Sequence, residues 1–311
     1  MNNKSLVSIV IPVYNGEKSI VKLVNHLVKE LTKKYKLEIV LINDCSPDNS
    51  ERECILSYQK HSDIVKFYSL SKNVGEHNAV MAGLNNTTGD FAVIMDDDFQ
   101  NPVSEVIKLI DFAFEFQNDV VYTYYDKKKH SFFRNLGSKF NGKVATVLLK
   151  KPKDLYLSSF KIVNRFLINE IIKYDLPFPY IDGLILRTTN NLGKIKVSHN
   201  KREEGKSNYT LKKLISLWLN MFTNFSVLPL RLSMIIGFVF SLFGFGYGIF
   251  SIIEKLSNPN LPMGYTTIIV LVSLFSGIQL IALGMVGEYL GRMFMSQNKK
   301  PQYSIRKSFV K

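Results

Sequence analysis

The stretch Phe91-Ala92-Val93-Ile94-Met95-Asp96-Asp97-Asp98-Phe99-Gln100 decides the fold of this chain, because it joins an apolar run to a cluster of carboxylates. An apolar run bounded by a turn, here Gly89-Asp90, is typical of a fully buried strand. In an open α/β sheet, ligands collect beyond the carboxyl ends of the strands, which is where the acidic cluster falls. Three adjacent carboxylates repel one another, and a bound cation would relieve that repulsion.

Asp96, Asp98 and Gln100 are the candidate metal ligands of this stretch. In an extended segment these alternate residues point to the same side. Their hard oxygen atoms suit Mg²⁺ or Mn²⁺, with a substrate phosphate in the remaining coordination positions. The alternative is a solvated acidic turn that binds nothing.

Strand-like and helix-like segments alternate from Leu6 to about Val197, which predicts an α/β fold with a mostly parallel sheet covered on both faces. The alternation becomes unclear after about Lys127. The predicted strands are Leu6–Ile11, Glu38–Ile42, Ile64–Ser69, Phe91–Met95 and Val120–Tyr124, and the predicted helices are Ser19–Leu31, Ser50–His61, Glu76–Leu84 and Val103–Phe116.

Two uncharged apolar segments, Leu232–Ile253 and Thr266–Val286, are each long enough to cross a bilayer. The short turn between them predicts an antiparallel transmembrane hairpin, the alternative being two buried core helices. Because basic residues flank the hairpin outside its loop, the positive-inside rule places both termini and the N-terminal domain in the cytoplasm, at the inner membrane. The flanking basic residues are Arg231, Arg292, Lys299, Lys300, Arg306, Lys307 and Lys311.

Two further segments, Thr210–Phe222 and Phe132–Lys151, have an apolar face and basic residues elsewhere, which predicts helices lying in the bilayer interface. A core helix with a solvated basic face is the alternative for Phe132–Lys151. The net charge of +14 is then explained by anionic lipid, and no nucleic-acid motif is found. The predicted layout is a catalytic domain at 1–209, an interfacial helix at 210–230, the hairpin at 231–290 and a basic cytoplasmic tail at 291–311.

The motifs together resemble glycosyltransferase family 2, with its GT-A fold, and within it the polyprenyl-phosphate branch. That branch includes dolichyl-phosphate mannose synthases, undecaprenyl-phosphate glucosyltransferases and the undecaprenyl-phosphate formamido-arabinose transferase. The matching pieces are Ile11-Pro12-Val13-Tyr14-Asn15, the segments 43–48, 73–83 and 89–90, Asp96–Pro102, and the Arg202–Tyr209 element before the hairpin.

The resemblance implies inverting, metal-dependent transfer of a sugar from a nucleotide-sugar to a polyprenyl phosphate, with undecaprenyl phosphate expected, for cell-envelope glycan or lipopolysaccharide modification. Self-association into a homo-oligomer stays open. The implied nucleotide-sugar contacts are Pro12, Tyr14, Asn15, Asp44, Asn73, Gly75 and Asp96, with Asp97 facing nucleotide or sugar. The implied catalytic residues are Asp97, Asp98, Arg134, Arg202 and Asp182, and the implied acceptor-phosphate contacts are Arg134, Ser138, Arg202 and Ser207.

Two motifs depart from the family pattern. The first loop usually reads Asn-Glu, but here Asn15 is followed by Gly16 and then Glu17. The second usually reads Asp-Asp-Gly-Ser, but here it is Asn43-Asp44-Cys45-Ser46. Asp44 is therefore favoured over Asn43 and Glu17 as a nucleotide contact, unless the substitutions tune the choice of base or sugar.

Several alternatives remain at this point. A hydroxyl-acceptor glycosyltransferase would need Asp182 as its base, whereas Asp182 could equally be a turn residue. Arg134 could be an ordinary surface arginine, and a membrane-tethered scaffold with a vestigial site is the non-enzymatic alternative. Structural roles are the alternatives for Pro12, Tyr14, Asp48, His77 and His199.

Overall fold

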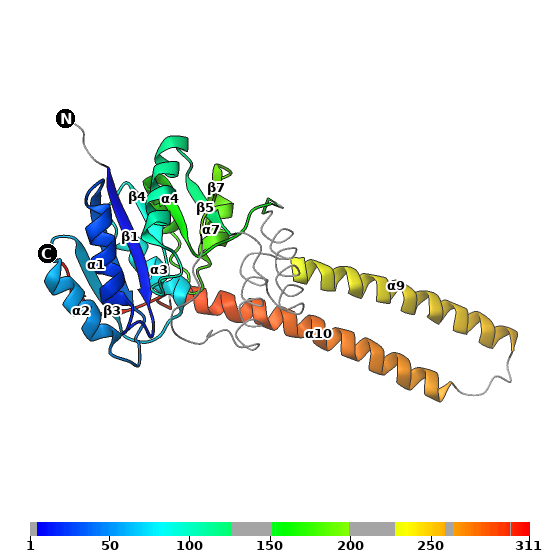
Figure 1. The fold of residues 1–311 in the computed structure, drawn as a ribbon. Helices are drawn as coiled ribbons and strands as arrows, with labels where there is room; N and C mark the ends of the chain where they lie inside the picture. Colours follow the sequence, from blue (N-terminus) through cyan, green and yellow to red (C-terminus); the bar gives the residue numbers. More distant parts are fainter. Residues whose placement is uncertain (1–4, 126–150, 153, 199–227, 259–263, 299) are drawn as a thin grey trace. The chain divides into compact units, whose positions relative to one another are not determined.

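The computed structural model describes residues 5–125, 151–152, 154–198, 228–258, 264–298 and 300–311. The chain divides into two units, residues 1–211 with 300–311 and residues 212–299. The first unit contains a sheet with helices, and the second contains two long helices (Figure 1).

The first unit is built on an eight-stranded sheet in the order β7-β5-β6-β4-β1-β2-β3-β8. Strands β3, β2, β1 and β4 are parallel neighbours, while β6 and β8 run antiparallel to their neighbours. The predicted mostly parallel, Rossmann-like sheet is therefore confirmed. The elements before the second unit are β1 (Leu6–Val13), α1 (Ile20–Leu31), β2 (Lys36–Asn43), α2 (Ser50–Lys60), β3 (Val65–Leu70), α3 (Glu76–Asn85), β4 (Phe91–Ile94), α4 (Val103–Phe116), β5 (Val120–Tyr124), β6 (Lys161–Asn164), α6 (Arg165–Ile171), α7 (Ile181–Thr188) and β7 (Leu192–Lys196).

Apolar side chains alternate between the two faces of the sheet, so both faces are covered. In β2, Ile39 and Leu41 join the core beneath α1, α2 and α4, whereas Val40 and Ile42 join the core beneath α3. Helix α3 packs on β1 and β2 and also contacts α7, which contacts α6. The period of two residues in the strands thus produces the layered arrangement.

The C-terminal segment returns to the first unit as β8 (Ile305–Phe309), an element that the sequence pattern does not predict. It pairs antiparallel with β3 and forms one edge of the sheet. The ring of Phe309 stacks on Phe67 with 5.7 Å between centroids. The segment expected to be only a basic tail therefore includes a strand that covers the edge of β3.

The second unit consists of α9 (Leu228–Ser257) and α10 (Tyr265–Gln297). Leu230–Glu254 and Leu274–Gln297 are long and apolar enough to cross a membrane. Large side chains such as Phe238, Phe243 and Leu256 are exposed along α9. The segment Thr210–Phe222 and nearly all of Phe132–Lys151, where interfacial helices are predicted, lie outside the described residues.

Candidate active site

Four loops follow β1, β2, β3 and β4 at the carboxyl edge of the sheet, and each contains a residue with a left-handed backbone. These residues are Asn15 (φ 60°), Cys45 (φ 52°), Gly75 (φ 88°) and Phe99 (φ 58°). Such conformations cost about 1–3 kcal/mol in a non-glycine residue and cluster at functional sites. Because β3, β2, β1 and β4 are neighbours, the sheet brings the four motif loops to one edge.

Side-chain hydrogen bonds hold the first two loops together, and they include Glu17, which the departure at the first loop had left uncertain. One carboxylate oxygen of Glu17 accepts hydrogen bonds from the Asn49 backbone N–H at 3.0 Å and from its Nδ2 at 3.2 Å. Asp48 Oδ2 accepts from the Glu17 N–H at 3.2 Å, and Ser50 Oγ accepts from the Gly16 N–H at 2.8 Å. Glu17 and Asp48 therefore fix the loops.

Asp44 joins the second loop to the third. It is 4% exposed, its Oδ1 accepts from the Val74 N–H at 2.7 Å, and its Oδ2 accepts from the Gly75 N–H at 2.9 Å. These bonds fix the residues that open α3, with Gly75 as its N-cap. The predicted contacts Tyr14, Asn15 and Asn73 are exposed at this edge, while Pro12 lies within β1 beside Ile42 of β2.

Asp96, Asp97 and Asp98 follow β4 and are each partly buried. Asp96 Oδ2 accepts a hydrogen bond from Ser159 Oγ at 2.8 Å, and Asp98 Oδ1 accepts from the Gln100 N–H at 3.1 Å. The left-handed Phe99 interrupts the extended chain, so the alternation expected to place Gln100 on the side of Asp96 and Asp98 is not observed.

The donor set fits a divalent ion that is bound jointly with a substrate. Within the described residues, no group of three or more His, Cys, Asp or Glu side chains is arranged to hold a metal. Mg²⁺ is usually bound by one or two carboxylates together with water and substrate phosphates, and not by an all-protein cage. Asp96 and Asp98 supply carboxylates of that kind at the carboxyl edge, where open α/β sheets commonly bind ligands.

Asp182, the candidate base, lies in a buried polar cluster. It is 7% exposed, and its Oδ1 accepts hydrogen bonds from Tyr122 Oη at 2.9 Å and from the Lys161 ammonium. The Lys161 Nζ also lies 5.1 Å from the centroid of the Tyr122 ring. A carboxylate held in this way is arranged as one partner of a structural ion pair, which argues against its use as a base.

His77 is similarly placed for a structural role. Its ring meets that of Tyr180 edge-on, with 5.0 Å between centroids. Burial, and to a lesser extent the charge of Lys161, lowers the pKa of His77 to about 4, although Asp182 acts in the opposite direction. The imidazole is therefore neutral at physiological pH.

Several predicted residues lie outside the described part of the chain, namely Arg134, Ser138, His199, Arg202 and Ser207. Conversely, the sequence pattern did not single out Ser159 or the Lys161 and Tyr122 partners of Asp182. Ser159 and Lys161 belong to β6 and the residues before it, where the regular alternation is lost, so no local signal indicated them.

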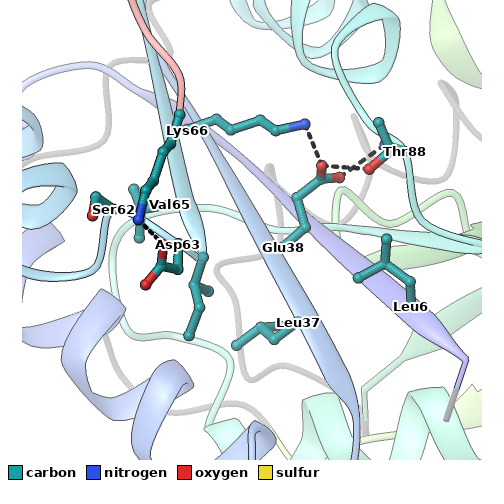
Figure 2. Close-up of a pocket in the computed structure, with 10 residues that line it drawn as sticks. Leu6, Leu37, Glu38, Ser62, Asp63, Val65, Lys66 and Thr88 are labelled. Atoms are coloured by element: carbon teal, nitrogen blue, oxygen red, sulfur yellow. Dashed lines mark hydrogen bonds and ion pairs between the residues drawn. The ribbon is translucent and has the colours of Figure 1, made fainter.

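A separate cavity of about 330 Å³ lies at the opposite, amino end of β1, β2 and β3 (Figure 2). Glu38, one of the residues that line it, is 5% exposed and accepts hydrogen bonds from Lys66 Nζ at 2.6 Å, the Thr88 N–H at 2.9 Å and Thr88 Oγ1 at 2.7 Å. Ser8 Oγ also donates to Glu38. These bonds give Glu38 a structural role and leave the carboxyl edge as the candidate active site.

Comparison with known proteins agrees with this assignment. The model of glycosyl transferase family 2 matches residues 8–175, which include all four loops. The chain belongs to glycosyltransferase family 2. A second model, the GtrB C-terminal hairpin, matches residues 228–293, which cover α9 and most of α10.

Relatives of similar length match nearly the whole of this chain. An undecaprenyl-phosphate 4-deoxy-4-formamido-L-arabinose transferase of Proteus mirabilis (strain HI4320) is 31% identical over 306 residues, covering 97% of this chain and 93% of the relative. The enzyme of that name from Serratia proteamaculans (strain 568) is 32% identical with the same coverage. The chain is thus a glycosyltransferase.

The fold of the first unit also recurs in solved structures. Glucosyl-3-phosphoglycerate synthase of Mycobacterium tuberculosis, crystallised with Mn²⁺, UDP-glucose and phosphoglyceric acid, matches with a TM-score of 0.51 and 16% identity. The match covers 70% of this chain and 79% of the synthase. At this identity the likeness bears on the fold alone.

Proposed function

We propose that this glycosyltransferase transfers a sugar, with inversion, from a nucleotide-sugar to a polyprenyl phosphate, and that undecaprenyl phosphate is the natural acceptor. The observation that carries the proposal is that four loops, each with one residue of positive φ, lie with Asp96 and Asp98 at one edge of the sheet. The same chain also has two long apolar helices. The relatives named above act on undecaprenyl phosphate by their own names, which supports the same acceptor here.

A phosphate acceptor agrees with the observed environment of Asp182. The second pKa of a phosphate monoester is near 6, so the acceptor is largely ionised at neutral pH and needs no strong base. A hydroxyl acceptor would require such a base, and Asp182 is bound by Lys161 and Tyr122 instead. This contrast favours the phosphate acceptor over the hydroxyl alternative.

We assign the following roles to the candidate site residues. Asp96 and Asp98, with Gln100 as a further candidate, would hold Mg²⁺ or Mn²⁺, which neutralises charge developing on a diphosphate leaving group. Pro12, Tyr14, Asn15, Asn73 and Gly75 would line the nucleotide-sugar, with Asp44 fixing the third loop. Arg134 and Arg202, with Ser138 and Ser207, are proposed to bind phosphate, since a guanidinium fork suits phosphate oxygens.

The acceptor can be tested with membranes that contain the protein. They are incubated with Mg²⁺, a panel of nucleotide-sugars, and either undecaprenyl phosphate or the free polyprenol, and the glycolipid is identified by mass. We expect a product only from the phosphate, at a rate that rises with pH to a plateau as the phosphate loses its second proton. Equal use of the free polyprenol would overturn the proposed acceptor. Membranes that contain the Asp98→Asn variant measure the background activity of the assay.

We also propose that the catalytic domain and both termini face the cytoplasm. The test uses Asn258→Cys, between the two apolar helices, in a Cys45→Ser background. A membrane-impermeant thiol reagent should label intact cells of this variant. The parent protein provides the matched control, because Cys45 is exposed on the catalytic domain and should react only after lysis. Labelling of Cys45 in intact cells, with protection of the introduced cysteine, would reverse the orientation.

A further inference from the structure

Gly16 and Asp97 come from different loops and meet in space. A Cβ atom added to Gly16 would lie 2.2 Å from Asp97 Oδ2, 3.2 Å from Asp97 Cγ and 3.0 Å from Val13 Cγ1. Gly75 is the only glycine with positive φ in the described part of the chain, so the backbone at Gly16 does not itself demand glycine. A side chain at position 16 would therefore have to displace the Asp97 carboxylate, which occupies that space.

The Asp97 carboxylate also points into the protein. Its Oδ2 is buried. Burial, followed by the charge of Asp97, raises the pKa of the Cys54 thiol in α2. The Gly16 N–H donates to Ser50 Oγ at the start of the same helix. Asp97 is therefore inserted beneath the first loop, toward α2.

The contact accounts for the departure of this chain from the family pattern at position 16. The family usually carries a glutamate directly after the asparagine of the first loop, whereas this chain has Gly16 there. Glu17 does not replace that glutamate, since its carboxylate is bonded to the backbone and side chain of Asn49. The carboxylate that does lie against position 16 is that of Asp97, from the loop after β4.

We propose that Asp97 supplies, from the fourth loop, the carboxylate that family 2 usually carries on the first loop, and that Gly16 is the residue that admits it. Asp97 is then a positioning residue that holds the first loop, with Tyr14 and Asn15, in the conformation that binds the nucleotide. The inference rests on the proposed nucleotide-sugar donor. It separates Asp97 from Asp96 and Asp98, which remain the metal candidates.

A double-mutant cycle tests this pairing. Gly16→Ala, Asp97→Ala and the double variant are compared for binding of a panel of nucleoside diphosphates with Mg²⁺ and for nucleotide-sugar KM and kcat. Each single change should weaken nucleotide binding by about tenfold, and the double variant should be no weaker than Asp97→Ala alone, as for two residues in direct contact. Gly16→Glu combined with Asp97→Ala should recover most of the loss, because it returns the carboxylate to the first loop.

A matched control separates this effect from general disturbance of packing. Gly193→Ala in β7 places a Cβ 2.6 Å from Asn118 Oδ1, a similar steric conflict with a polar side chain away from the four loops. It should lower the melting temperature without changing the KM for nucleotide-sugar. Additive losses in the cycle, or no recovery with the relocated glutamate, would overturn the pairing. Failure of the parent protein to bind any of these nucleotides would overturn the proposed donor and this inference with it.

Discussion

The two ends of the central sheet both carry acidic side chains, but they use them differently. At the amino end, hydrogen bonds from Lys66, Ser8 and Thr88 outweigh burial and lower the pKa of Glu38. At the carboxyl end, Asp96 and Asp98 are less buried and accept bonds from a hydroxyl and a backbone amide. The cavity lies at the amino end, where it is lined by Glu38. The presence of a cavity therefore does not by itself mark the candidate active site, which lies at the other end of the sheet.

The largest expected effect is the loss of activity in Asp98→Asn. The substitution keeps the size of the side chain but removes one charge from the edge where the metal is proposed to bind. Turnover should fall on the order of 10²–10³-fold, comparable to the loss of one electrostatic group at an active site. The melting temperature should stay close to that of the parent. Near-normal turnover at saturating Mg²⁺ would remove Asp98 from the proposed metal site.

The opposite result is expected for Lys66→Met at the amino end. The Lys66 and Glu38 side chains are 24% and 7% exposed, so the substitution leaves a buried carboxylate without its ammonium partner. Removal of one partner of a buried pair costs on the order of 3–5 kcal/mol of unfolding free energy. Thermal or denaturant unfolding in detergent measures this cost, and turnover per folded molecule should be unchanged. An unchanged stability would show that the ion pair contributes nothing.

The sequence predicts the first half of the fold closely because its signals there are local. Elements β1 to β5 and α1 to α4 fall within about two residues of the expected bounds, since short loops join strongly patterned segments. The β6–α6–α7 region begins with an antiparallel strand of four residues, β6, which breaks the alternation. Strand β8 pairs with a partner more than 230 residues earlier in the chain, and such long-range pairing leaves no local pattern.

The same distinction applies to the candidate site. The loops are predictable because asparagine, glycine and aspartate after a strand favour turns and left-handed backbones. What the sequence could not give is the partner of each acid: Lys161 for Asp182, Asn49 for Glu17 and Gly16 for Asp97. These pairings depend on the tertiary fold, and they decide which carboxylates remain candidates for chemistry.

The pH dependence of stability offers a further test at the carboxyl end. Because folding lowers the pKa of His77 to about 4, the unfolded chain takes up a proton near pH 6.5 while the folded chain does not. Stability should be fully present above about pH 6.5 and fall as the pH decreases toward 4, by on the order of 2–3 kcal/mol from this residue. Unfolding measured at several pH values should show a smaller decrease in His77→Gln. Parallel curves for the two proteins would contradict the neutral state of His77 in the folded protein.

The smallest expected effect on stability comes from the ion pair between Lys307 and Glu51, whose N–O distance is similar to that of Lys66 and Glu38. Lys307 of β8 lies 2.5 Å from Glu51, close to the 2.6 Å between Lys66 and Glu38, but the Lys307 and Glu51 side chains are 49% and 33% exposed. Water already solvates these charges, so Lys307→Met should change the unfolding free energy by about 1 kcal/mol or less. The change is matched to Lys66→Met in residue type and pair distance, so the comparison isolates the effect of burial. Equal losses in the two variants would mean that distance, and not exposure to solvent, sets the strength of these pairs.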